Sequence, residues 1–138
     1  RKGFVDVVLA NGCPSPAEAY GAFEFETGIK AGLELLGSPD RPTAIFAGND
    51  ESAAGVMAAA SHLRIKGPDE VSIVGFDNSW VALSVWPPLT TINQPIAEIA
   101  EVAAQMLIDR NGAMTEAGDL LLDYHLVARG SYAPPSPA

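Results

Sequence analysis

The chain of 138 residues contains little cysteine, histidine or basic charge. Its single cysteine, Cys13, excludes a disulfide within the chain and offers no spacing typical of a metal site, so we expect neither a metal nor a cofactor. Eight basic residues stand against 17 acidic ones, which gives a net charge of −9. Proteins bind DNA mainly by neutralising phosphates, so we expect DNA contact only through a region outside this sequence.

The chain also lacks long apolar runs and the common motifs of enzymes. No window approaches the roughly eighteen consecutive apolar residues of a membrane span, and the N-terminus has no secretory signal pattern, so we expect a cytoplasmic protein. A nucleophile elbow, a phosphate loop and a dinucleotide fingerprint are all missing. Asp50 and Asp77 could form a magnesium-binding pair, but no acidic pair follows a first strand. We therefore predict that the chain is not an enzyme.

Hydrophobic periodicity predicts helices that alternate with short strands. The expected helices are Phe4–Leu9, Phe25–Leu36, Glu51–Leu63 and Ile96–Arg110, and the expected strands are Ala19–Phe23, Thr43–Ala47, Val71–Phe76, Thr90–Ile92 and Leu120–Ala128. This alternation indicates an α/β fold, a parallel sheet with right-handed crossovers and helices on both faces. We expect one folded unit over residues 1–131 and a disordered tail over residues 132–138.

Polar pairs follow two of the expected strands. Asn49-Asp50 comes after Thr43–Ala47, and Asp77-Asn78 comes after Val71–Phe76. Ligands of open α/β sheets bind beyond the carboxyl ends of the strands, so the two pairs predict one polar small-molecule site. Each residue also has a local alternative: Asp77 can cap a turn, Asn49 can be a turn residue, and Asp50 can cap the helix that follows.

Four motifs resemble the LacI/GalR (lactose/galactose repressor) family of bacterial transcription regulators. They are RPTAIFAGND with the AAG behind it, VSIVGFDN, PPLTTI with NQP, and VARGS. The resemblance runs from Arg1 to Ser131 and covers about half of the family's effector-binding core, but not its DNA-binding headpiece. It implies one lobe of a two-lobed fold like the periplasmic sugar-binding proteins, with an effector between the lobes and the helix at 96–110 belonging to the other lobe.

The resemblance also implies which residues contact the effector. These residues are Asp77, Asn49, Phe23, Gln94 and Asp50. Phe23 stands where the family often carries an aromatic ring that stacks on a sugar or a nucleobase. The family usually has an arginine three positions before the pair that is Gly3-Phe4 here, and that position precedes the first residue. We therefore expect feeble effector binding, or none, by this chain alone.

A second implied surface is the contact between two copies of the chain. The helix Glu51–Leu63 is rich in small residues, and the loop Trp80–Trp86 carries much apolar surface, which is typical of interface centres. The alternative is that the alanines pack on the sheet and the tryptophans cover the edge of the core. The predicted homodimer interface consists of Ala54, Met57, Ala58, Trp80, Val81, Val85 and Trp86.

The predicted function is therefore the ligand-sensing part of a LacI-type transcriptional regulator. In the family, an effector closes the cleft between the lobes and so changes the affinity of a helix-turn-helix headpiece for operator DNA. The expected partners are a sugar or purine-like effector, a second copy of the chain, and operator DNA through the absent headpiece, with no membrane contact. The alternative function is the solute-binding protein of a sugar transporter, but PPLTTI and VARGS resemble the regulators more closely.

Overall fold

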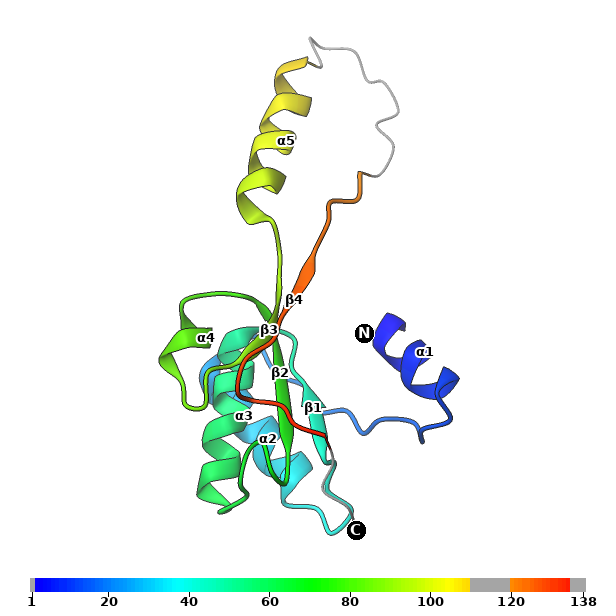
Figure 1. Ribbon diagram of the computed structural model, residues 1–138, viewed down its shortest axis with the longest axis vertical. Helices are drawn as coiled ribbons and strands as arrows, with labels where there is room; N and C mark the ends of the chain where they lie inside the picture. The colour runs from blue at the N-terminus through cyan, green and yellow to red at the C-terminus, as the bar shows by residue number, and fades with distance from the viewer. Residues whose placement is uncertain (1, 110–119, 135–138) are drawn as a thin grey trace.

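The computed structural model describes residues 2–109 and 120–134 and confirms the α/β class (Figure 1). Helices and strands alternate along most of the chain, as the hydrophobic pattern predicts. In chain order the elements are α1 (Lys2–Ala10), α2 (Phe25–Leu36), β1 (Ala44–Phe46), α3 (Asp50–His62), β2 (Ser72–Asp77), α4 (Val81–Ser84), β3 (Thr90–Asn93), α5 (Ile96–Asp109) and β4 (His125–Val127). The predicted helix end at Arg110 lies outside the described residues.

The four strands form one sheet in the order β1-β2-β3-β4. β1 with β2 and β2 with β3 are parallel, whereas β4 runs antiparallel to β3. Parallel strands buried by helices read as short, continuous apolar runs, and this accounts for the Ile, Val and Phe content of β1 and β2. The sheet is therefore parallel over its first three strands, and its carboxyl ends lie at one edge.

One face of the sheet is covered by α3, and α2 packs on α3. The core joins Ile45 of β1, Ile73 of β2 and Leu89 to Val56 and Ala60 of α3. The two helices approach closely, since a Cβ added at Gly32 of α2 would lie 2.7 Å from the Cβ of Ala59. Small residues in α3 thus allow close packing against α2 within the single chain.

Among the described residues, α1 covers the other face of the sheet near β1. Phe46 of β1 points away from the α3 layer and stays 40% exposed. The ring of Phe4 from α1 stacks on it, with ring centroids 5.5 Å apart and an interplanar angle of 19°. In Figure 1, α1 lies well apart from the layer formed by α2 and α3. Helices therefore lie on both faces, but their coverage is unequal.

α5 extends away from the body of the fold. Figure 1 shows it rising beyond the end of the sheet, next to the segment that leads into β4. None of the side chains from Ile96 to Ile108 is buried, although the helix is strongly apolar along one side. Its exposed apolar residues include Ile96, Ile99, Met106, Leu107 and Ile108.

Two expected strands differ from the structure. The strand expected at Ala19–Phe23 is wrong: residues 13–22 have no helix or strand, and Phe23 has a φ of 60°. This segment follows Pro14 and Pro16, which cannot donate to a sheet, and it pairs with no strand. The strand expected over Leu120–Ala128 is reduced to β4, because only residues 125–127 lie in register with β3.

The structure describes residues 132–134 of the expected disordered tail, and one of them contacts β2. The backbone N–H of Ala133 donates to the hydroxyl of Ser72 at 3.1 Å, and that hydroxyl bonds the carbonyl of Ala133 at 3.1 Å. Ala133 therefore lies beside Ser72, the first residue of β2. The rest of the predicted tail, residues 135–138, lies outside the described residues.

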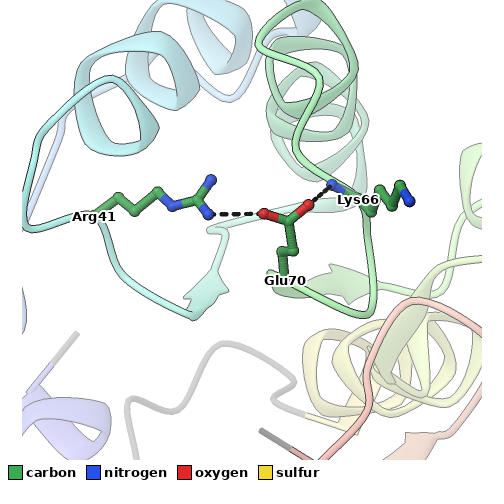
Figure 2. A network of polar contacts seen from close by, with 3 residues as sticks. All are labelled: Arg41, Lys66 and Glu70. Atoms are coloured by element: carbon green, nitrogen blue, oxygen red, sulfur yellow. Dashed lines mark hydrogen bonds and ion pairs between the residues drawn. The ribbon is translucent and has the colours of Figure 1, made fainter. Parts of the chain in front are cut away.

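Polar contacts also join the segments that enter β1 and β2, at the end of the sheet opposite the two polar pairs. Figure 2 shows Glu70 between the Arg41 guanidinium, 2.8 Å away, and the backbone N–H of Lys66, 3.0 Å away. The hydrogen bond from Arg41 is the main cause that lowers the pKa of the Glu70 carboxyl from its ordinary value of 4.5. These contacts fix the connection between α3 and β2.

Candidate functional site

The polar pairs after β1 and β2 meet at the carboxyl edge of the sheet. Asp50, the first residue of α3, accepts hydrogen bonds from the backbone N–H of Ser79 at 2.6 Å and from the hydroxyl of Thr91 at 2.5 Å. Ser79 lies just beyond β2, and Thr91 lies in β3. One carboxylate therefore ties the segments that follow β1 and β2 to the second residue of β3. The segments that follow β1 and β2 are therefore in contact, while the predicted small-molecule site stays a prediction.

Asp50 itself faces the interior. Its side chain is 1% exposed, and its two oxygens are used by Ser79 and Thr91. A buried carboxylate is tolerated when donors satisfy its oxygens. Asp50 therefore stabilises the carboxyl edge of the sheet from the protein interior. Gly75 of β2 makes room for it, because an added Cβ would collide with the Asp50 carboxylate. The inward orientation leaves Asp50 poorly placed to contact a ligand.

Asn49 links the start of α3 to the preceding segment. Its Oδ1 accepts from the backbone N–H of Ser52 at 2.9 Å and so caps α3. Its Nδ2 donates to the carbonyl of Phe23 at 2.9 Å. The capping role that the sequence leaves open for Asp50 therefore belongs to Asn49, one residue earlier.

Phe23 presents an aromatic ring beside this cap. The ring is 65% exposed, and its Cε1 would lie 2.8 Å from a Cβ added at Gly48. Gly48 therefore allows the ring to lie against the turn between β1 and α3. The hydrogen bond from Asn49 holds the backbone of Phe23 beside the start of α3.

Asp77, the last residue of β2, and Gln94, the residue after β3, lie at the same carboxyl edge of the sheet. Nε2 of Gln94 donates to Oδ1 of Asp77 at 2.5 Å, and both side chains are half-buried. The backbone at this corner is unusual, with a φ of 116° at Asp77 and 56° at Asn78. Non-glycine residues rarely adopt positive φ, and the surrounding contacts must maintain that conformation. Such geometry is found more often at functional sites than elsewhere.

Several residues that build this corner are not predicted from the sequence. Nδ2 of Asn78 donates to Oδ1 of Asn93 at 2.8 Å, and the Oδ1 of Asn78 accepts from the Arg129 guanidinium at 2.6 Å. The motif that contains Arg129, VARGS, is visible in the sequence, but nothing in it predicts a contact 51 residues away. The partner of Arg129 follows only from the antiparallel return of β4.

Two hollows flank Phe76, which lines both of them. The larger has a volume of about 590 Å³ and includes Phe23, Gly48 and Ser52 in its wall. The smaller has a volume of about 430 Å³ and includes Gln94 and Ile99. Both are mainly apolar, whereas Asn49 and Asp77 lie on neither wall. Apolar walls with a few polar groups beside them are typical of small-molecule sites.

The residues of the expected dimer interface fall into two groups. Trp80 and Trp86, on either side of α4, are 76% and 88% exposed, and Ala58 and Val81 are half-buried. In contrast, Ala54 is only 4% exposed in the single chain, and Met57 and Val85 pack partly against the core. The open apolar surface is therefore concentrated on the tryptophans and not on α3.

Within residues 2–109 and 120–134, no cluster of three or more histidine, cysteine or acidic side chains could hold a metal ion. In the same residues, no helix is both long and apolar enough to cross a bilayer.

Comparison with known proteins places these features in a family. Residues 1–132 match the family described as periplasmic binding protein-like domain. The chain is 42% identical over 114 residues to the HTH-type transcriptional repressor CytR of Escherichia coli (strain K12), covering 82% of the chain and 33% of that protein. The chain therefore spans about a third of the length of this curated relative.

Solved structures agree with the sequence match. A transcriptional regulator CelR-cellobiose complex superimposes with a TM-score of 0.85 at 33% identity, over 94% of this chain and 41% of that one. A lac repressor dimer bound to operator and the anti-inducer ONPF superimposes with a TM-score of 0.89 at 26% identity, over 96% of this chain and 46% of that one. The chain belongs to the periplasmic binding protein-like domain family, as an effector-binding domain of the LacI/GalR transcriptional regulators.

Proposed function

We propose that the chain is the ligand-sensing part of a longer transcriptional regulator. Its effector, a sugar or a nucleobase-like molecule, binds at the carboxyl edge of the sheet and is covered by a second lobe. The observation that supports this proposal is the hydrogen bond from the backbone N–H of Ser79 to Asp50, which brings the segment after β1 next to the segment after β2. Ligands of open α/β sheets bind beyond an edge of this kind.

The chemistry of the edge suits a ligand with polar rims and a flat apolar face. Asp77 has one oxygen bonded to Gln94, and no described residue bonds its second oxygen, which can accept from a ligand hydroxyl or amide. The exposed ring of Phe23 can stack on a sugar or a base. Asp50 is left out of the proposed contacts because it is buried.

The proposed output is control of DNA binding. The solved relative bound to operator is a regulator, and the chain matches only part of it, so a headpiece in the longer protein would make the DNA contact in the cytoplasm. Effector binding stabilises the closed arrangement of two lobes and thereby changes the affinity for DNA, as linkage between two sites requires. The acidic charge of this chain is consistent with a sensing role and not with direct DNA contact.

The proposed partner is a second copy of the chain. The tryptophans around α4 leave a large apolar surface open, and large aromatic side chains carry much of the binding energy at interface centres. The lac repressor in the compared structure is a dimer. We place the interface on Trp80, Val81 and Trp86, with Ala58 and Met57 of α3 beside them.

The effector site is tested by calorimetric titration of the longer regulator with cellobiose, D-ribose and adenine. Asp77→Ala should weaken binding of whichever compound binds by roughly ten- to a hundredfold, because hydrogen bonds to a charged group are lost. The matched control is Asp40→Ala, an exposed aspartate in the segment that enters β1. Equal affinities for the two variants would exclude Asp77 from the site.

The interface is tested by sedimentation of the Trp80→Ala and Trp86→Ala variants against Leu121→Ala. Leu121 is 87% exposed but lies on the wall of the smaller hollow and not at α4. Each tryptophan variant should raise the dimer dissociation constant by roughly thirtyfold or more, which corresponds to a hot-spot residue of about 2 kcal/mol. A monomer at all concentrations, or an unchanged constant, would contradict the proposed interface.

A further inference from the structure

Arg129 lies where the last described strand returns past the site. One nitrogen of its guanidinium donates to the carbonyl of Leu89 at 2.7 Å, and another donates to Oδ1 of Asn78 at 2.6 Å. Its backbone N–H donates to the hydroxyl of Thr90 at 2.8 Å. The residue thus binds the segment after β4 to the start of β3 and to the corner after β2.

The acceptors of this guanidinium are unusual for a half-buried arginine. Both are neutral oxygens, and among the described residues Arg129 forms no ion pair with a carboxylate. The planar guanidinium can hold two acceptors in a fixed relation, which a lysine cannot do. A hydrogen bond with a charged donor is also stronger than one between neutral groups.

The corner that Arg129 holds is the one that carries Asp77. Asn78 is bound on one side by Arg129 and on the other by Asn93, and its backbone N–H donates to the hydroxyl of Thr91 at 3.3 Å. Both Asp77 and Asn78 have positive φ. A conformation that non-glycine residues rarely adopt relaxes unless several contacts maintain it.

We propose that Arg129 is a positioning residue that acts through Asn78 and holds the Asp77 carboxylate in its binding orientation. Arg129 does not contact the effector itself; it fixes the backbone from which Asp77 projects. This inference rests on the proposed function for its consequence, weaker effector binding. The geometric part, a fixed corner, can be measured without any effector.

The rival explanation is that Arg129 only fastens the end of the chain to the sheet. Ser131 provides a matched control for that role, because its hydroxyl bonds the carbonyl of Ile73 and the backbone N–H of Thr90 but does not contact the corner. Arg129→Gln and Ser131→Ala both loosen the same segment. Only Arg129→Gln removes a contact to Asn78.

The first experiment measures amide hydrogen exchange in the full chain. The backbone N–H of Ser79, bonded to the buried Asp50, reports on the corner, and that of Ala47, bonded to Val74, reports on the sheet. Arg129→Gln should raise the ratio of the Ser79 rate to the Ala47 rate by roughly tenfold, and Ser131→Ala should leave the ratio unchanged. Equal ratios in the two variants would overturn the inference.

Asn78 variants test whether the effect passes through that side chain. Asn78→Ala should raise the exchange ratio as Arg129→Gln does, and the double variant should show no further rise. Asn78→Asp keeps an acceptor for the guanidinium and should preserve most of the protection. Additive effects in the double variant would show that Arg129 acts by another route and would overturn the proposal.

The second experiment measures effector affinity in the longer regulator with the compound that binds in the calorimetric panel. Arg129→Gln should weaken binding by roughly tenfold, and Ser131→Ala should not. If no compound in the panel binds even to the unchanged protein, the proposed function fails while the exchange ratio still decides the role of Arg129. If Asp77→Ala weakens binding but Arg129→Gln does not, the positioning role fails and the proposed function stands.

Discussion

α3 and α5 are helices of similar length, but α3 is largely buried and α5 is exposed to solvent. α3 has 13 residues, a weak separation of apolar and polar sides, and seven buried residues. α5 has 14 residues and a much clearer apolar side, yet none of its side chains up to Ile108 is buried. α5 therefore has the sequence better suited to packing, yet it is the helix exposed to solvent in the described structure.

The difference shows that burial depends on the available partner and not on the apolar pattern alone. α3 lies between the sheet and α2, and its glycine and alanines allow both neighbours to approach. α5 begins directly after β3 and leads away from the sheet, so it reaches neither neighbour. An exposed apolar side of this kind is characteristic of a surface that another part of a protein covers. We therefore keep the prediction that α5 belongs with a second lobe.

The largest expected effect comes from filling the space between α2 and α3. A Cβ at Gly55 would collide with the carbonyl of Phe25, so Gly55→Ala should lower the free energy of unfolding by about 3 kcal/mol. Gly3→Ala is the control, because nothing lies within 4 Å of its added Cβ, and it should be neutral or stabilising by up to about 1 kcal/mol. Denaturant unfolding followed by circular dichroism measures both. Equal stabilities would mean that the two helices are not in close contact.

The next largest effect is expected from the hydrogen bond that Thr91 donates to Asp50, the first residue of α3. Thr91→Val keeps the shape of the side chain but removes the hydroxyl that donates to the buried Asp50, at an expected cost of about 1–3 kcal/mol. Thr43→Val, at an exposed position before β1, should change stability by no more than about 0.5 kcal/mol. The same unfolding assay applies. A neutral Thr91→Val would show that water or another donor satisfies Asp50.

A direct comparison of the two helices uses one truncation in each. Val56→Ala in α3 removes buried atoms at 3% exposure and should cost about 1–2 kcal/mol, whereas Leu107→Ala in α5, at 73% exposure, should cost less than about 0.5 kcal/mol. A large loss from Leu107→Ala in this chain would reveal that α5 is packed in solution. In the longer protein the Leu107 variant should become costly if a second lobe covers α5.

The smallest effect on stability is expected at Glu70, in the segment between α3 and β2. Arg41 holds the pKa of Glu70 below its ordinary value of 4.5, so the folded state favours the charged carboxyl. The stabilisation is complete above pH 4.5 and is lost as the pH falls through the lower folded pKa. The free energy of unfolding should therefore fall slightly less on acidification in the Glu70→Gln variant than in the unchanged protein, as denaturant unfolding at several pH values would measure. An unchanged pH profile would show that solvent screens this exposed pair completely.

The sequence predicts the buried strands and most helices well, because their apolar periodicity reflects local burial. β1, β2, β3, α2 and α3 all lie within the predicted ranges or within a residue of them. The strand expected at Ala19–Phe23 fails because apolar residues alone do not form a strand without a neighbouring strand to pair with. The predicted contacts of Asp77, Asn49, Phe23 and Gln94 with an effector remain predictions.

The sequence by itself determined the α/β class, the positions of the first three strands and the polar residues at their ends, because these depend on patterns within a few residues. Only the tertiary structure decided that Asp50 faces inward and that Arg129 reaches Asn78 across 51 positions. Those roles depend on which segments the folded sheet brings side by side. Hydrogen bonds between distant segments leave no periodic signal in the sequence.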